Sequence, residues 1–62
     1  MKDALVWSQA GKKYAILTKE ILSIEGDSKV DYCKILVSYS DEPIDVSLNI
    51  DEVLQKLNIE NI

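Results

Sequence analysis

Three clusters of turn-forming residues divide this 62-residue chain into short runs rich in Ile, Val, Leu and Tyr. The clusters are Ala10-Gly11, Gly26-Asp27-Ser28 and Ser40-Asp41-Glu42-Pro43. Short apolar runs separated by turn residues are typical of a meander of β-hairpins. The spacing therefore predicts a small antiparallel sheet of four to five strands.

The clearest alternation of apolar and polar residues runs from residue 32 to residue 39. We expect one set of alternate side chains to face the core: Cys33, Ile35, Val37 and Tyr39. The next run repeats the pattern, with inward side chains expected at Ile44, Val46 and Leu48. Three earlier runs, 4–8, 13–17 and 21–24, are also predicted as strands. For the run 21–24, the alternative is that it forms part of a helical turn after Thr18.

The period of the apolar residues changes at Asn49. They then follow one stripe of a helix: Ile50, Val53, Leu54 and Leu57. Asn49 suits the N-cap, Glu52 occupies the capping-box position, and Asn58 can adopt the left-handed conformation that ends a helix. A two-turn helix is unstable alone. The prediction is one α+β domain, residues 1–62, with a short C-terminal amphipathic helix packed on one face of the sheet.

The residue types that carry most enzyme chemistry are scarce. The chain has no histidine, no arginine and one cysteine, Cys33, which fits a strand interior better than a nucleophile. The acids Glu25, Asp27 and Asp31 do not follow a calcium-loop spacing, so a solvated turn explains them better. We therefore expect a protein that is not an enzyme, with no catalytic residue, cofactor or metal.

The charge balance disfavours nucleic acid as a partner. Seven basic residues oppose eleven acids, for a net charge of −4 and an isoelectric point near 4.5. Phosphate binding normally needs a basic face. No apolar run has the length of a signal peptide core or a membrane span, and a lone cysteine suits a reducing compartment, so we expect a cytoplasmic protein.

A second set of apolar residues is expected on the side of the sheet that the helix does not cover. If the strand phases hold, this partner or oligomer interface consists of Val6, Ala15, Leu17, Ile21, Tyr32 and Leu36. A monomer seldom exposes such a patch, and a second copy of the chain is the simplest cover. The alternatives are a phase error, or curvature that wraps the small sheet around a single core.

Most of the chain resembles the small flagellar proteins of the FlbD/SwrD family. The similarity lies in the runs 11–17, 21–25, 34–37 and 44–57, with their hydrophobic spacing and amphipathic ending. It implies a non-enzymatic cytosolic accessory to flagellar motor function, with no catalytic residues. This chain departs from that pattern by a longer segment at 26–31 and by lacking a glycine at 40–43.

Residues 21–57 are also similar to the first half of LytTR DNA-binding domains, with the matching strand at 32–35. The second half of such a domain is absent, and the net charge does not suit DNA. We interpret this similarity as a shared strand-strand-helix arrangement rather than a shared function.

These observations predict a small regulatory protein of bacterial or phage type that forms homo-oligomers and binds a larger protein, as its regulator or inhibitor. One alternative is an acidic phage-type decoy that occupies a nucleic-acid-binding protein through Glu25, Asp27, Asp31, Asp41 and Glu42. Another is a small-molecule or nucleotide binder formed between subunits by Lys12, Lys13 and the tyrosines.

Overall fold

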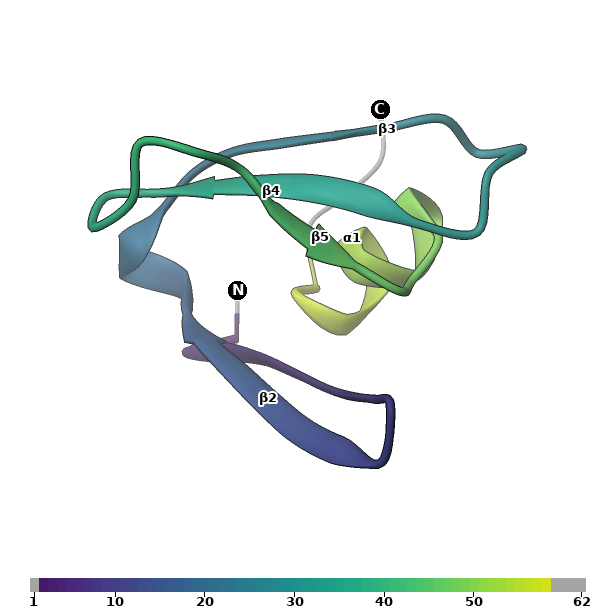
Figure 1. Ribbon diagram of the computed structural model, residues 1–62, viewed down its shortest axis with the longest axis horizontal. Coiled ribbons are helices and arrows are strands. Elements are labelled where there is room, and N and C mark those ends of the chain that lie inside the picture. Colours follow the sequence, from purple (N-terminus) through teal and green to yellow (C-terminus); the bar gives the residue numbers. More distant parts are fainter. Residues whose placement is uncertain (1, 59–62) are drawn as a thin grey trace.

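A computed structural model describes residues 2–58 of the chain (Figure 1). The elements in chain order are β1 (Ala4–Gln9), β2 (Lys12–Leu17), the 3₁₀ turn η1 (Thr18–Glu20), β3 (Ile21–Gly26), β4 (Cys33–Val37), β5 (Ile44–Val46) and the helix α1 (Ile50–Lys56). The predicted α+β class is confirmed. The strand predicted at 21–24 is confirmed as part of β3, and the alternative is wrong because the helical turn ends at Glu20, before this run.

The strands form two antiparallel sheets and not the single meander that the sequence predicts. β1 pairs with β2, and β3, β4 and β5 form a second sheet in that order. The reason is η1, which interrupts the extended chain between β2 and β3, so these two strands do not pair. In Figure 1 the β1–β2 hairpin lies below the three-stranded sheet, and α1 lies beside the gap between them.

The hairpin is closed by a two-residue turn whose backbone requires positive φ angles. Ala10 has φ 53° and Gly11 has φ 76°. Two successive positive φ angles are typical of the turn that matches the right-handed twist of paired strands. The resulting register runs from Gln9 opposite Lys12 to Ala4 opposite Leu17.

The core lies between the two sheets and the helix. Its fully or almost fully buried side chains are Leu5, Trp7 and Ile16 from the hairpin, Cys33, Ile35, Val37 and Val46 from the second sheet, and Val53 and Leu57 at the helix. The inward positions predicted for β4 and β5 are thus confirmed, with Ile44 and Leu48 partly buried against the core. The prediction for Tyr39 is wrong, because β4 ends at Val37 and Tyr39 is 64% exposed.

The helix begins and ends where its capping residues predict. The side chain of Asn49 accepts a hydrogen bond from the Asp51 backbone N–H at 2.8 Å, and Asn58 has φ 61°. The Asn49 Nδ2 also donates to the backbone oxygens of Ser28 at 2.7 Å and Val30 at 2.9 Å. One residue therefore caps the helix and holds the β3–β4 loop against it.

A glutamine joins the hairpin to the rest of the molecule. The Gln9 Oε1 accepts hydrogen bonds from Trp7 Nε1 and from the Ser47 backbone N–H, both at 2.9 Å. Trp7 is 5% exposed, so its indole N–H needs a partner inside the protein. Gln9 satisfies that donor and links β1 to the segment that follows β5.

Candidate functional site

Cys33 lies where a nucleophile could not act. Its side chain is 1% exposed, and burial raises the pKa of its thiol above the ordinary value of 9.0. A thiol with a raised pKa stays protonated near neutral pH and is a poor nucleophile. Among residues 2–58, no group of three or more acidic or cysteine side chains is arranged to hold a metal ion. In the same residues, no helix is long and apolar enough to cross a membrane.

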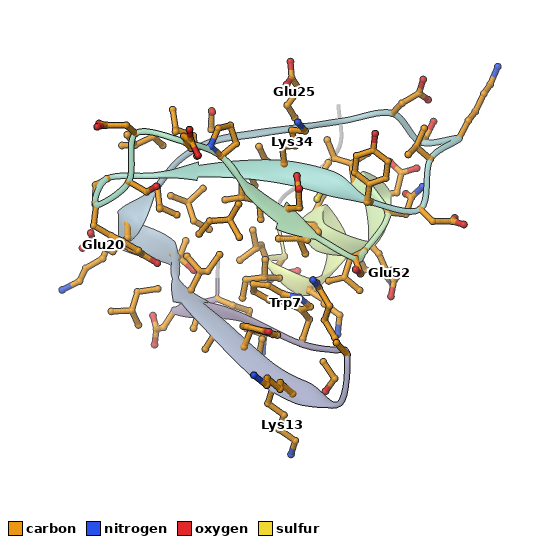
Figure 2. All side chains as sticks on the ribbon, in the orientation of Figure 1. Trp7, Lys13, Glu20, Glu25, Lys34 and Glu52 are labelled. Carbon is orange, nitrogen blue, oxygen red and sulfur yellow. The ribbon has the colours of Figure 1, made fainter. Side chains whose placement is uncertain are left out.

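The hairpin presents an outer face that points away from the core. Its residues alternate with the buried ones and pair across the strands: Ala4 with Leu17, Val6 with Ala15, and Ser8 with Lys13. Val6 is 54% exposed and Leu17 is 51% exposed. Figure 2 shows Lys13 extending from β2 away from the three-stranded sheet. We call these six residues the outer hairpin face.

The three-stranded sheet has an outer face of its own on the opposite side of the molecule. Its cross-strand pairs are Ser23 with Leu36, Glu25 with Lys34, and Lys34 with Asp45. Leu36 is half-buried, and Tyr32, which precedes β4, is exposed. In Figure 2 Glu25 and Lys34 lie on the side of the sheet away from the hairpin. The outer sheet face is defined as Ser23, Glu25, Tyr32, Lys34, Leu36 and Asp45.

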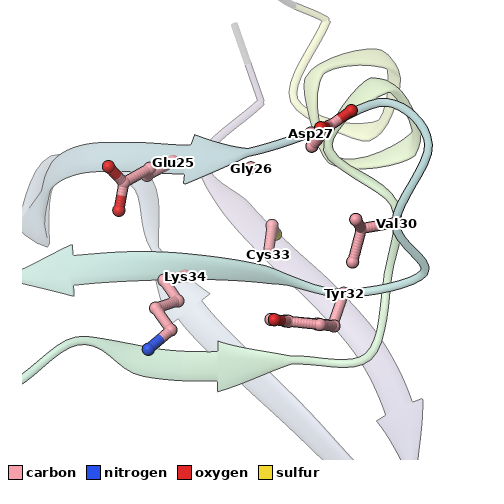
Figure 3. A pocket seen from close by; sticks show the side chains of 7 residues that line it. All are labelled: Glu25, Gly26, Asp27, Val30, Tyr32, Cys33 and Lys34. Carbon is pink, nitrogen blue, oxygen red and sulfur yellow. The ribbon is translucent and has the colours of Figure 1, made fainter.

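A shallow hollow lies at the loop end of this second face (Figure 3). It has a volume of about 230 Å³ and is lined from Glu25 to Asp27, by Val30, and from Tyr32 to Lys34. Figure 3 shows Tyr32 and Lys34 on one side of β4 and Cys33 on the other. The thiol therefore belongs to the core, and the hollow offers a partner an aromatic ring with a lysine and two carboxylates around it.

The six predicted interface residues fall into two groups and one exception. Val6, Ala15 and Leu17 lie together on the outer hairpin face, and Tyr32 and Leu36 lie on the outer sheet face. Ile21 instead is partly buried and packs against the core. The expectation of one shared patch assumed a single sheet, so the division into two sheets separates the groups.

Charge is divided between the two halves of the molecule, a feature that the sequence analysis missed. Residues 2–19 contain four lysines and one acid, for a net charge of +3, whereas residues 21–46 contain two lysines and six acids, for −4. Lys2 and Lys19 line a hollow together with Leu17, next to the outer hairpin face. Counting charges by predicted hairpin would have found this division.

A groove of about 320 Å³ lies between the hairpin and β5. Its lining includes Trp7, Tyr14, Tyr39 and Ile44. Tyr14 stacks on Trp7, with ring centroids 5.4 Å apart and planes 20° apart. Because Tyr14 and the core cover Trp7, the aromatic rings that this groove presents to solvent are those of Tyr14 and Tyr39.

No protein-family model, no curated protein and no solved structure matches this chain. The resemblance to the FlbD/SwrD family therefore stays a prediction.

Proposed function

We propose that this protein is a non-enzymatic interaction module that self-associates and binds a larger protein. The observation that supports this most is the outer hairpin face, where Val6 and Leu17 are each about half exposed around Ala15. The interior of the protein already has a complete core between its sheets and helix. Exposed, adjacent aliphatic side chains of this kind often mark a surface that another molecule covers.

The setting that we propose is the cytoplasm, where a lone buried thiol is stable. The resemblance to the FlbD/SwrD family makes the flagellar motor the first system in which to seek the larger partner. In that role the protein would act by contact, as a regulator or an inhibitor, and would carry no reaction of its own.

Capture of partners with matched variants tests this proposal. The tagged wild-type protein is crosslinked in its native host and compared with Leu17→Asp and with Gln55→Asp, a control that adds the same charge at an exposed helical position. We expect the same larger protein with the wild type and the control, and its loss with Leu17→Asp. Equal recovery with all three proteins would contradict a role for the outer hairpin face.

A second candidate function, an acidic decoy, is favoured by the charge of −4 on residues 21–46. Glu25, Asp27 and Asp31 lie near one end of the three-stranded sheet, and Asp41 and Glu42 lie in the loop between β4 and β5. Such a decoy would occupy a basic surface of a nucleic-acid-binding protein. Its binding would weaken steeply with salt, whereas capture that is insensitive to salt would count against it.

A further inference from the structure

We propose that copies of this chain associate head to tail, with the outer hairpin face of one copy seated on the outer sheet face of the next. This inference rests on the proposed self-association and specifies its geometry. The occupant of each face is thus the other face of a second copy, and not the same face related by a two-fold axis.

The positions of the two faces favour a head-to-tail contact. The inner sides of both sheets contribute to one core, with Leu5 and Ile16 from the hairpin and Ile35 from the second sheet. The outer faces therefore point in opposite directions (Figure 2). A two-fold contact covers the same face on both copies and leaves the other face of each copy exposed. A head-to-tail contact covers the hairpin face of one copy and the sheet face of the next, so repeated contacts can cover both faces.

The charges of the two faces are complementary. The outer hairpin face carries Lys13 and belongs to a segment of charge +3, whereas the outer sheet face carries Glu25, Lys34 and Asp45, net −1, and belongs to a segment of charge −4. A contact between two hairpin faces or between two sheet faces would bring like charges together. The head-to-tail contact instead brings the positive segment of one copy to the negative segment of the next. Like charges facing each other disfavour a complex, and complementary charges favour the correct orientation.

The two faces also combine apolar and charged side chains. On the hairpin Val6, Ala15 and Leu17 have Lys13 at one end of the face and Lys2 and Lys19 near Leu17 at the other. On the sheet Tyr32 and Leu36 lie on either side of Lys34, which pairs with Glu25 and Asp45. Apolar side chains together with charged ones are typical of protein interfaces.

A head-to-tail contact has a consequence that a two-fold contact lacks. Each added copy leaves one hairpin face and one sheet face free, so assembly continues until a ring closes or a filament forms. We therefore expect wild-type assemblies larger than a dimer as concentration rises, with smaller assemblies in high salt because the charges at the rim are then screened.

Mixing two variants tests this geometry. Leu17→Asp places a negative charge on the outer hairpin face, and Leu36→Asp places a negative charge on the outer sheet face, so the two altered faces repel each other. Each variant alone should sediment as one chain of 7.0 kDa, because each lacks one of the two faces that a contact needs. An equal mixture should form a heterodimer of twice that mass and stop there, because the one intact hairpin face meets the one intact sheet face.

Two results would overturn this geometry while leaving self-association in place. In the first result, the wild type assembles but the mixture of the two variants stays monomeric. In the second, one variant on its own assembles like the wild type. A wild-type protein that stays monomeric at high concentration would overturn both the geometry and the self-association of the proposed function.

A second pair of variants guards against loss of folding. Leu36 is half-buried, so the folding of each variant is checked by the fluorescence of Trp7, which lies in the core. If Leu36→Asp does not fold, Tyr32→Asp replaces it at a 53% exposed position, and Val6→Asp similarly replaces Leu17→Asp. The expected results are the same, because these residues lie on the same two faces.

Discussion

Gly26 at the end of β3 lies directly against Ile50 at the start of α1. A Cβ atom added at Gly26 would lie 3.0 Å from the Ile50 Cβ and 2.9 Å from the Cys33 Cβ. Both neighbours are atoms fixed to the backbone and not flexible ends of side chains. The absence of a side chain at Gly26 thus allows the helix and β4 to approach β3 this closely.

We predict that Gly26→Ala lowers the free energy of unfolding by about 1–3 kcal/mol, because overpacking forces a backbone shift. Urea denaturation followed by Trp7 fluorescence measures this change. The control is Ser28→Ala, an exposed loop position where we expect a change within about 0.5 kcal/mol. Equal midpoints for Gly26→Ala and the wild type would show that the close approach is not needed.

A loss of about 1–3 kcal/mol is expected for Gln9→Ala. The substitution leaves the almost fully buried Trp7 indole N–H without its acceptor and also removes the bond from the Ser47 N–H. The neighbouring exposed residue provides a control, Ser8→Ala, which should unfold like the wild type. The interpretation fails if both variants unfold at the same urea concentration.

Asn49 combines two roles that two substitutions separate. Asn49→Ser retains an oxygen acceptor for the Asp51 N–H but removes the Nδ2 donor to Ser28 and Val30, whereas Asn49→Ala removes both. Loss of an N-cap costs about 1 kcal/mol. We predict that unfolding free energies fall in the order wild type, Asn49→Ser, Asn49→Ala, and an alanine variant as stable as the serine variant would contradict the capping role.

Stability at alkaline pH should depend on Cys33. Burial raises the pKa of its thiol above 9.0, so the folded protein keeps this proton at pH values where the unfolded chain loses it. The stabilisation is complete below the pKa of the unfolded chain and is lost as pH rises from there through the folded pKa. The measurement is the difference in unfolding free energy between the wild type and Cys33→Ala, which we expect to decrease above about pH 9. A difference independent of pH would contradict the burial of the thiol.

The sequence predicts the local structure of this protein well because local signals determine it. Asn49 and Asn58 mark the ends of the helix through their own capping conformations, and the strict alternation in 33–37 identifies a half-buried strand. The turn at Ala10-Gly11 follows from a glycine that accepts a positive φ. Each of these features involves only neighbours along the chain.

The division into two sheets has no such local signal. It depends on a turn at Thr18, where the backbone N–H bonds to the Asp3 oxygen at 2.8 Å, and this partner is remote in sequence. Alternation correctly places Val6, Ala15 and Leu17 on one outer face. It could not show that Leu36 belongs to the opposite side of the molecule, because that depends on the number of sheets.

Sedimentation equilibrium of the wild-type protein over a wide concentration range tests the central claim most directly, because the proposed function requires the chain to self-associate. The account predicts an apparent mass that rises with concentration to a multiple of 7.0 kDa. A mass that stays at 7.0 kDa up to the highest concentration would contradict it.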